Sequence, residues 1–343
     1  MKRRARDWKK CATELATAMP RERLHPAVVA WADARPTGER WAAAFSGGAD
    51  SLALLLLLWA HWPERRLRLV ALHFNHRLRG AESRGDAVFC RRVCAALGIE
   101  LIEGEWKDAP KTVSEAAART ARFAFFRQAL RGRRTRVVWL GQQQDDIAET
   151  MLMRIARGSG TAGLAAPRPL QEQLGSRIHA RPLLTLKKTE IVAALRSVGA
   201  EWREDSSNAG DDYFRNRLRK TVVPAWSEAS GRDALAGAAL ARELLEEDDA
   251  ALERWLLELK VEAKDGALEL SKLKGKPRGL FRRALHQWLS NQKGLGELSR
   301  QGFERLLAAL EAGGDTRHSL GRKAFAVIRR QRLMIQKTAL RAD

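Results

Sequence analysis

Cysteine is scarce in this 343-residue chain, which contains only Cys11, Cys90 and Cys94. A small, odd number of cysteines argues against a scaffold held by disulfides and favours a reducing compartment. The chain has no Cys-x-x-Cys pair, which argues against zinc ribbons and simple iron–sulfur sites. Cys90 and Cys94 are spaced to share one face of a predicted helix, so we expect them to be packing residues.

Long apolar runs are also missing. The longest run, Leu52–Ala60, falls well short of the ~20 residues that a membrane-spanning helix needs. The N-terminal segment is basic but has no apolar core and no cleavage site, unlike a secretory signal. Its arginines would suit an organelle transit peptide, but Asp7 and Glu14 argue against one. We therefore expect a cytoplasmic protein with no membrane association.

Acidic residues are too few to balance the basic ones. Lys and Arg number 62 against 41 Asp and Glu, which leaves a formal net charge of +21. This excess points to a polyanionic partner, nucleic acid first and an anionic membrane surface second. A GC-rich genome that favours arginine is the alternative explanation, but balancing acids would then be expected. Hydrophobic residues make up 45% of the chain, enough for a sizeable core, and the length suggests two or three domains.

Residues 40–141 alternate strand-like with helix-like segments. Apolar runs predict strands over Arg40–Phe45, Leu67–Phe74, Leu101–Trp106 and Arg136–Leu140. Between them, helical spacing predicts helices over Ala49–Trp62, Ser83–Leu97 and Ser114–Leu130. This rhythm predicts a Rossmann-like α/β domain, in which a parallel sheet has helices on both faces. Ligands of such sheets bind beyond the carboxyl ends of the strands.

The pattern changes after about Pro224. Helical spacing runs from Trp226 to Lys260, and further helices are predicted over Arg278–Ser290 and Leu298–Ala312. Short β-like runs close the chain, at His318–Leu320 and Phe325–Ile335, and the last 30 residues carry eight Arg or Lys and two Asp. We therefore predict four parts: a basic N-terminal extension (1–35), the α/β domain (36–224), a helical connector (225–262) and a small basic α+β domain (263–343).

A loop between the first predicted strand and helix gives the strongest chemical signal: Ser46-Gly47-Gly48-Ala49-Asp50-Ser51. Adjacent glycines let the backbone approach a ligand, and amides at the following helix N-terminus point at a bound anion. Both serines can donate hydroxyl hydrogen bonds to phosphate. Asp50 cannot bind phosphate directly, so in a phosphate cradle it implies a bridging Mg²⁺. An ordinary turn with Asp50 as a cap is the alternative, but it does not explain the combination of residues.

The hexapeptide is not a Walker A loop, because no Gly-Lys-Ser/Thr follows it. It resembles the Ser-Gly-Gly-x-Asp-Ser motif of the PP-loop ATP pyrophosphatases, which have an adenine nucleotide alpha hydrolase-like fold. The resemblance implies cleavage of ATP between its α and β phosphates, adenylation of an acceptor oxygen and release of pyrophosphate. That superfamily adenylates several kinds of substrate, so the loop alone does not name one.

Further motifs follow in order along the chain: His73–Arg79, Ser114–Arg119, Gly141–Thr150, Arg157–Gly160, Arg181–Leu184, Trp202–Asn208 and Arg215–Arg219. The series is similar to that of the tRNA(Ile)-lysidine synthase family, whose members modify the wobble cytidine of a CAU anticodon. The similarity runs from about Trp41 to Pro224. It is weaker over Lys260–Lys337, which resembles the family's small tRNA-binding domain. The length fits the compact version of the family.

The resemblance implies an ATP-dependent carbon–nitrogen ligase that acts on tRNA. Its substrates would be an isoleucine tRNA with a CAU anticodon, free L-lysine and ATP with Mg²⁺. The reaction would pass through an adenylated cytidine, release AMP and pyrophosphate, and change codon reading from AUG to AUA. A wobble base lies in a single-stranded loop, so it can enter a pocket at little unpairing cost. The resemblance also implies a homodimer.

Site residues are carried over motif by motif. The nucleotide-binding set would be Ser46, Gly47, Gly48, Ala49, Asp50, Ser51 and Arg119. Asp50, also the Mg²⁺ ligand, would act with three carboxylates that hold the lysine cation, the cytosine amino group or Mg²⁺: Asp145, Asp146 and Glu149. The tRNA substrate would contact Arg215, Asn216 and Arg219. Without the resemblance, the acids would be an ordinary helix N-terminal cluster, and the arginines, Arg119 included, solvated helix residues.

One departure from the family pattern concerns Gln142-Gln143, which stand where the family usually has His-His. Glutamine can form hydrogen bonds but cannot take up a proton or become cationic near neutral pH. Either the role of this pair is positional, or activity is reduced or redirected. Two alternatives therefore stay open: a catalytically weakened tRNA-binding relative, and a tRNA thiolation enzyme of the same superfamily. The second would need catalytic or cluster-binding cysteines.

Overall fold

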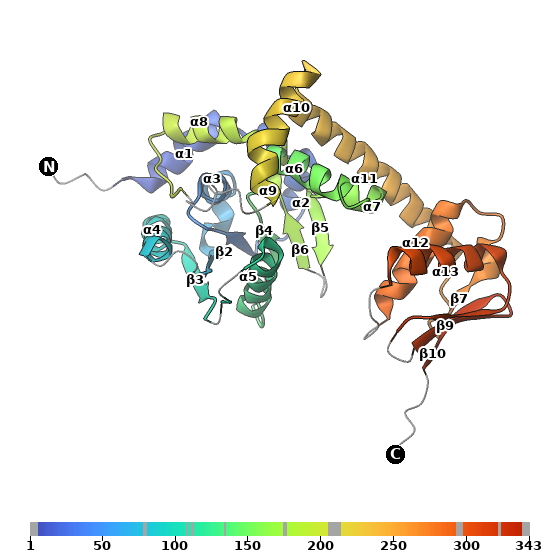
Figure 1. Ribbon diagram of the computed structural model, residues 1–343. Helices are drawn as coiled ribbons and strands as arrows, with labels where there is room; N and C mark the ends of the chain where they lie inside the picture. Colours follow the sequence, from blue (N-terminus) through green and yellow to red (C-terminus); the bar gives the residue numbers. More distant parts are fainter. Residues whose placement is uncertain are drawn as a thin grey trace. The chain divides into compact units, whose positions relative to one another are not determined.

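The structure is a computed structural model of the chain (Figure 1). It describes residues 6–77, 81–107, 109–110, 113–133, 135–173, 177–204, 214–292, 298–321 and 324–337. Parts of two motifs lie outside this description: Leu78 and Arg79 of the first, and Asp205–Asn208 of the second. The chain divides into two compact units, Met1–Glu246 and Glu247–Asp343, each with its own hydrophobic core.

A six-stranded sheet forms the centre of the first unit. Its strands are β1 (Arg40–Ala44), β2 (Leu69–Asn75), β3 (Glu100–Glu105), β4 (Thr135–Trp139), β5 (Leu170–Gln173) and β6 (Arg177–Ala180). The strand order is β3-β2-β1-β4-β6-β5, and all neighbours are parallel except the β5–β6 pair. The chain builds outward from β1 to β3 and then returns to the other side of β1 with β4. The carboxyl ends of β1 and β4 therefore flank the switch point where open α/β sheets bind ligands.

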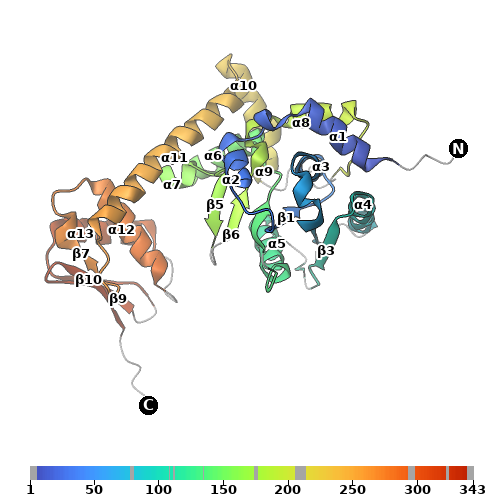
Figure 2. The same cartoon turned by 180° about the vertical axis from the view of Figure 1, so that it is seen from behind.

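Helices cover both faces of this sheet because alternate residues of a strand point to opposite sides. On one face, α3 (Ala49–His61) and α4 (Ala81–Leu97) pack over Trp41 and Ala43. On the other face, α5 (Glu115–Ala129) packs over Ala42. Figures 1 and 2 show α1 (Trp8–Ala18) and α8 (Lys188–Ser197) beside α3.

The described part of the predicted N-terminal extension belongs to the main core. Trp8 and Leu15 of α1 and Val28 of α2 (Pro26–Asp33) are buried in it. The ring of Trp31 also lies edge-on to Trp139, with 6.2 Å between ring centroids. The apolar residues of these two helices thus form a layer of the first unit.

The other helices of the first unit follow β4. They are α6 (Gln144–Ile155), α7 (Thr161–Leu164), α9 (Phe214–Arg217), a π-helical turn (Leu218–Val222) and α10 (Val223–Ser230). Shorter 3₁₀ turns lie at Arg21–Arg23, Pro63–Arg68 and Pro182–Thr185. The predicted connector consists of α10 and the long helix α11 (Ala234–Leu259), within which the two units meet in the sequence.

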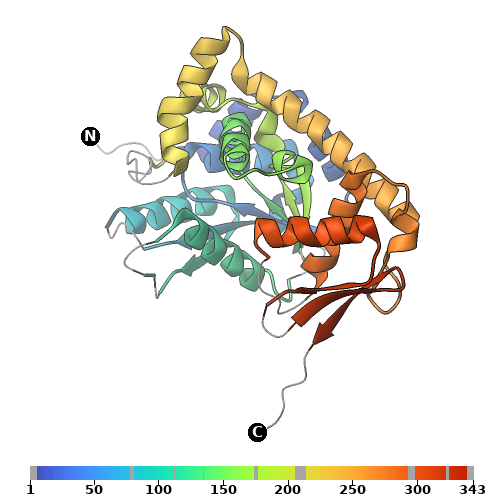
Figure 3. The same cartoon turned by 45° about the vertical axis from the view of Figure 1, so that its right-hand side comes forward.

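The second unit packs helices on one face of an antiparallel sheet (Figure 3). Its helices are α12 (Arg278–Asn291) and α13 (Arg300–Ala312), preceded by a 3₁₀ turn (Leu270–Leu273). The sheet has the order β7-β10-β9-β8, from β7 (Leu268–Glu269), β8 (Thr316–Ser319), β9 (Ala324–Arg329) and β10 (Arg332–Lys337). Ala326, Ile328 and Leu333 point to the helices and are fully buried.

The mostly parallel α/β sheet and the small C-terminal antiparallel sheet confirm the predicted fold class. All strands and helices predicted over residues 40–141 are present. The β5–β6 pair was not predicted, because its short strands, LQEQ and RIHA, have no run of apolar residues. Among the described helices, none is long and apolar enough to cross a membrane.

Candidate functional site

The predicted phosphate loop lies at the carboxyl end of β1, beside the switch point of the sheet. Gly47 has a φ of +91°, and a Cβ there would lie 3.3 Å from the Phe89 ring and 3.4 Å from Cys90 Sγ. The site therefore requires glycine for both its backbone conformation and its space. Gly48 is the N-cap of α3 and offers no side-chain cap, which leaves the amides of the first turn available to an anion.

Ser46 and Ser51 close this loop. Their Oγ atoms lie 3.1 Å apart, and Ser51 Oγ donates to the Gly48 carbonyl oxygen at 2.9 Å. The Ser46 amide donates to Ser51 Oγ at 3.2 Å. Both hydroxyls are thus held at the N-terminus of α3, where phosphate oxygens would lie.

Asp50, in the first turn of α3, has one carboxylate oxygen without a partner. Its Oδ1 is buried and forms no hydrogen bond, while its Oδ2 lies 3.6 Å from Lys188 Nζ. Burial raises the pKa of Asp50 to about 6, against the attraction of Lys188. A buried carboxylate oxygen without a hydrogen-bond partner is a suitable ligand for Mg²⁺. Among the described residues, no three His, Cys, Asp or Glu side chains are placed to hold a metal ion together, but Mg²⁺ on substrate phosphates needs only one or two protein carboxylates.

Gln143 caps helix α6, which starts just after β4. Gln143 Oε1 accepts a hydrogen bond from the Asp145 amide at 2.6 Å, and Asp146 Oδ2 accepts one from the Gln143 amide at 2.9 Å. This is a reciprocal capping box, and Gln143 is completely buried within it. The side chain of Gln143 thus fixes the start of the helix that carries the predicted acids.

The predicted carboxylates of α6 bind two different parts of the chain. Asp145 Oδ2 accepts from the Lys188 amide at 3.0 Å, which ties α6 to the start of α8. Asp146 and Glu149 instead meet the predicted tRNA-contacting arginines. Asp146 and Asp145 are neighbours in sequence, but only Asp146 shares an ion-pair cluster with Glu149.

Arg215 and Arg219 bind the Asp146–Glu149 pair from 66 to 70 positions along the chain. Arg215 donates to Glu149 Oε2 and to Asp146 Oδ1, each at 2.6 Å, and Arg219 Nε donates to Glu149 Oε1 at 2.6 Å. Burial opposes the charge of Arg215, but the two carboxylates outweigh it and raise its pKa. Glu149 is only 1% exposed, and Asn216 of α9 is also buried. The cluster joins two motifs that the sequence keeps far apart.

Arg119 and Arg122 lie on α5, near this cluster. Their guanidinium carbons lie 4.8 Å and 5.6 Å from the centroid of the Phe123 ring. Neither forms an ion pair with a carboxylate of the described residues. Burial and the positive charges of Arg119 and Arg215 lower the pKa of Arg122 to about 10. The unbalanced positive charge suits phosphate groups.

Two cations at the phosphate loop were missed in the sequence. Lys188 Nζ lies beside Asp50, as given above. Arg203 links the loop to α4. Its amide donates to the Gly47 carbonyl oxygen at 2.9 Å, and its Nε donates to Asp86 Oδ1 at 2.8 Å. Arg203 stands in the Trp202–Asn208 motif and Lys188 shortly after Arg181–Leu184, but no spacing in the chain relates either residue to the loop.

The three cysteines are buried free thiols. Burial raises the pKa of Cys94 to about 12 and that of Cys90 higher still. Cys90 and Cys94 belong to the main core, and Cys90 Sγ lies 3.4 Å from His73 Nδ1. Buried thiols with raised pKa values are poor nucleophiles and poor metal ligands, which argues against thiolation chemistry.

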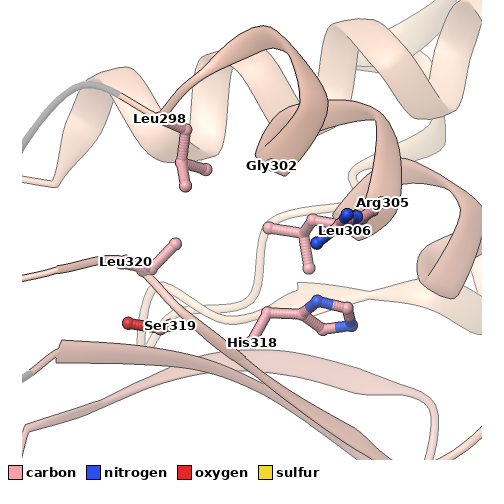
Figure 4. A pocket seen from close by; sticks show the side chains of 7 residues that line it. All are labelled: Leu298, Gly302, Arg305, Leu306, His318, Ser319 and Leu320. Atoms are coloured by element: carbon pink, nitrogen blue, oxygen red, sulfur yellow. The ribbon is translucent and has the colours of Figure 1, made fainter.

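The second unit has a small hollow between α13 and β8 (Figure 4). It is lined by Leu298, Gly302, Arg305, Leu306, His318, Ser319 and Leu320. Its wall has no carboxylate and no glycine-rich loop, so it offers no groups for ATP cleavage.

Comparison with known proteins places these features in a family. Residues 22–226 match the model of the PP-loop domain. The chain is 36% identical over 285 residues to a tRNA(Ile)-lysidine synthase of Geobacter sulfurreducens, covering 78% of this chain and 58% of that protein. It is 42% identical over 188 residues to the enzyme of that name from Solibacter usitatus, covering 55% and 41% of the two chains. It is 37% identical over 190 residues to the enzyme of that name from Bacillus subtilis, and this match covers 54% of this chain and 40% of that protein.

The chain thus spans about half the length of the curated relatives that it matches. A solved U34-tRNA thiolase from Methanococcus maripaludis aligns with 75% of this chain and 80% of its own, at 15% identity and a TM-score of 0.49, which is too distant to inform its function. The family match covers more than half of the chain and includes the phosphate loop, α6 and Arg215–Arg219. The chain therefore belongs to the PP-loop domain family.

Proposed function

We propose that this protein is a cytoplasmic tRNA(Ile)-lysidine synthase. It would use ATP and Mg²⁺ to join L-lysine to the wobble cytidine of an isoleucine tRNA with a CAU anticodon. One observation carries the proposal: a phosphate loop after β1 and a carboxylate pair on the helix after β4 meet at one edge of the sheet. The names of similar proteins from three bacteria support it.

The first step would adenylate the cytidine. The amides of the loop and the hydroxyls of Ser46 and Ser51 would hold the ATP phosphates. Asp50 would hold Mg²⁺, which when bound neutralises phosphate charge. The carbonyl oxygen of the ring would attack the α-phosphorus of ATP, and the bond to pyrophosphate would break. Arg119 and Arg122 would offer positive charge to the phosphates.

The second step would replace the adenylated oxygen with nitrogen. The lysine amine must lose a proton before it attacks the ring carbon, and AMP then leaves with the electrons of the carbon–oxygen bond. The Asp146 and Glu149 carboxylates would attract the ammonium form. The neighbouring guanidiniums of Arg215 and Arg219 would lower its pKa and favour the neutral amine. A buried cluster of both charges suits a group that binds as a cation and reacts as a neutral nucleophile.

We assign ATP chemistry to residues 36–224 and tRNA binding to the small domain over residues 263–343, joined by the connector over residues 225–262. The outward face of the second sheet supports this. Strand register places Arg317, Phe325 and Val327 on the face opposite the core. The guanidinium carbon of Arg317 lies 3.6 Å from the centroid of the Phe325 ring. An open sheet with aromatic and arginine planes suits unpaired bases and phosphates of RNA.

The test combines purified protein, ATP, Mg²⁺, radiolabelled lysine and an unmodified isoleucine tRNA with a CAU anticodon. We expect label to enter the tRNA in step with AMP release, and both to be lost in Asp50→Ala. Arg317→Ala should weaken tRNA binding about tenfold and reduce its dependence on salt. Arg300→Ala, which removes an equal charge from an exposed residue at the start of α13, serves as the matched control. A homodimer, also part of the proposal, would be tested by sedimentation.

Two results would contradict the proposal. AMP release without lysine incorporation would move the acceptor or the nucleophile elsewhere, as in a thiolation enzyme. Binding of the tRNA with neither signal would identify a catalytically weakened relative.

A further inference from the structure

A buried cation lies at the same edge of the sheet, and the chemistry described so far does not use it. Arg181 directly follows β6 and is 1% exposed. Its guanidinium donates three hydrogen bonds: Nε to Gln142 Oε1 at 2.5 Å, Nη1 to the Arg168 carbonyl oxygen at 2.7 Å, and Nη2 to Gln171 Oε1 at 3.1 Å. All three acceptors are uncharged, so nothing in this set of contacts neutralises the charge.

The charge of Arg181 acts on the site through low-dielectric surroundings. Burial and the nearby guanidinium of Arg119 lower its pKa to about 9, and Asp146 opposes them. Arg181 is therefore mostly cationic at neutral pH. A buried cation favours any negative charge that develops at this edge.

Gln142 connects this cation to the two motifs of the site. It lies in the turn 141–143, between β4 and α6. On one side of it, Gly141 packs on the backbone of Asp50, from which a Cβ would be only 2.9 Å away. On the other side, Gln143 caps α6. The Gln142–Arg181 hydrogen bond thus fixes the cation relative to both the phosphate loop and the carboxylates.

We propose that Gln142 is a positioning residue, whose amide oxygen holds the Arg181 guanidinium as a permanent buried cation at this edge of the sheet. The requirement at residue 142 is an uncharged hydrogen-bond acceptor, not a group that titrates. The role in lysine ligation rests on the proposed function. The pairing itself stands on the contacts of Arg181.

A neighbouring histidine indicates how an imidazole would behave at residue 142. Burial and the charges of Arg181 and Arg119 lower the pKa of His179 to about 3. A histidine in place of Gln142 would face Arg181, which is one of the two cations that act on His179. It would stay neutral from pH 5 to 8 and accept from Arg181 through one ring nitrogen. The glutamine therefore preserves an acceptor that histidine would also supply.

Three variants test the proposal, each measured for lysine ligation, AMP release and thermal unfolding. Gln142→Leu removes the acceptor at similar volume and should lower kcat at least tenfold, with the KM for ATP changed less than threefold. Its melting temperature should fall by roughly 5 °C, because a buried donor is left unpaired. Gln142→His should have a kcat and a melting temperature close to those of the wild type. Its kcat should show no additional decrease with acid between pH 5 and 8. Gln173→Leu, on the adjacent strand β5, is the matched control.

Gln142→Glu separates an electrostatic from a merely structural role. A carboxylate would hold Arg181 at least as firmly, so the fold should be as stable as the wild type. It would also cancel the buried charge, so kcat should fall at least tenfold.

Wild-type kcat in Gln142→Leu or Gln142→Glu would overturn the proposal, and so would a tenfold rate gain in Gln142→His. If the wild type releases AMP but does not ligate lysine, the proposed function fails, while AMP release still tests the pairing. If it does neither, the melting temperatures of Gln142→Leu and Gln142→His decide whether the acceptor is required.

Discussion

At the scale of single residues, Gly141 shows how little space separates the two halves of the site. A Cβ at this position would lie 2.9 Å from the Asp50 carbonyl oxygen and 3.1 Å from the Ser51 amide nitrogen. Both contacts are backbone atoms at the start of α3, which cannot move aside as a flexible side chain would. The turn after β4 and the phosphate loop after β1 therefore approach each other only through glycine.

We predict that Gly141→Ala separates these elements. The overpacking should cost about 1–3 kcal/mol of unfolding free energy and reduce ATP-dependent activity more than tenfold. Denaturant unfolding and AMP release measure the two effects. Gly237→Ala is the matched control, because Gly237 is exposed inside α11 with no atom within 4 Å of the added Cβ. It should stabilise the protein by about 1 kcal/mol, and equal effects of the two substitutions would contradict the packing argument.

At the scale of secondary-structure elements, the ion pairs of Glu149 attach α9 and the following π-helical turn to α6. Glu149 is 1% exposed and accepts hydrogen bonds from both Arg215 and Arg219. Asp146 adds a contact to Arg215. Leu218 is buried, but the segment 214–222 is otherwise mostly polar and basic. Its position therefore depends on charge.

We predict that Glu149→Gln destabilises the first unit by about 3 kcal/mol, because two partly buried guanidiniums lose the buried carboxylate that is their main partner. The segment 214–222 should then become cleavable by trypsin. Glu304→Gln is the matched control, because Glu304 also accepts from two arginines, Arg278 and Arg282, but on the surface of the second unit. Little change in stability is expected there. An unaltered tryptic pattern in Glu149→Gln would show that other contacts hold the segment.

At the scale of the whole molecule, the two units have separate cores, and buried histidines occur in the first. His25 is 7% exposed, and both of its ring nitrogens lack a hydrogen-bond partner. Burial, together with the charge of Arg242, lowers its pKa to about 4, and Glu243 lies 3.9 Å away. His179, in the same unit, is shifted in the same direction. The stability of this unit should therefore depend on pH below neutrality.

We predict that the first unit loses stability as the pH falls from about 6.5 to 4. In that range unfolded His25 binds a proton and folded His25 does not, so acid favours unfolding. Above pH 6.5 the contribution is complete, and its loss at pH 4 is about 3 kcal/mol for this residue. Denaturant unfolding across this range should show a shallower acid limb for His25→Leu than for the wild type. An unchanged slope would mean that His25 is not the group that titrates.

The sequence by itself determined much of the fold. Alternating apolar runs over residues 40–141 specified the strands and helices, because burial in a two-faced sheet demands those patterns. The hexapeptide at 46–51 identified the phosphate loop, since adjacent glycines before a helix serve close backbone approach. The same pattern could not reveal β5 and β6, whose short polar strands form only because β4 offers a partner edge.

Tertiary structure alone decided which side chains meet. Asp145, Asp146 and Glu149 looked equivalent in the sequence, but Asp145 binds the start of α8 while the other two bind arginines. Lys188 and Arg203 reach the phosphate loop from distant segments, and Arg181 meets Gln142 because β6 lies beside β4. Local sequence specifies backbone conformation through short-range sterics and hydrophobic period. The partners of a charge depend on long-range packing, which no local pattern contains.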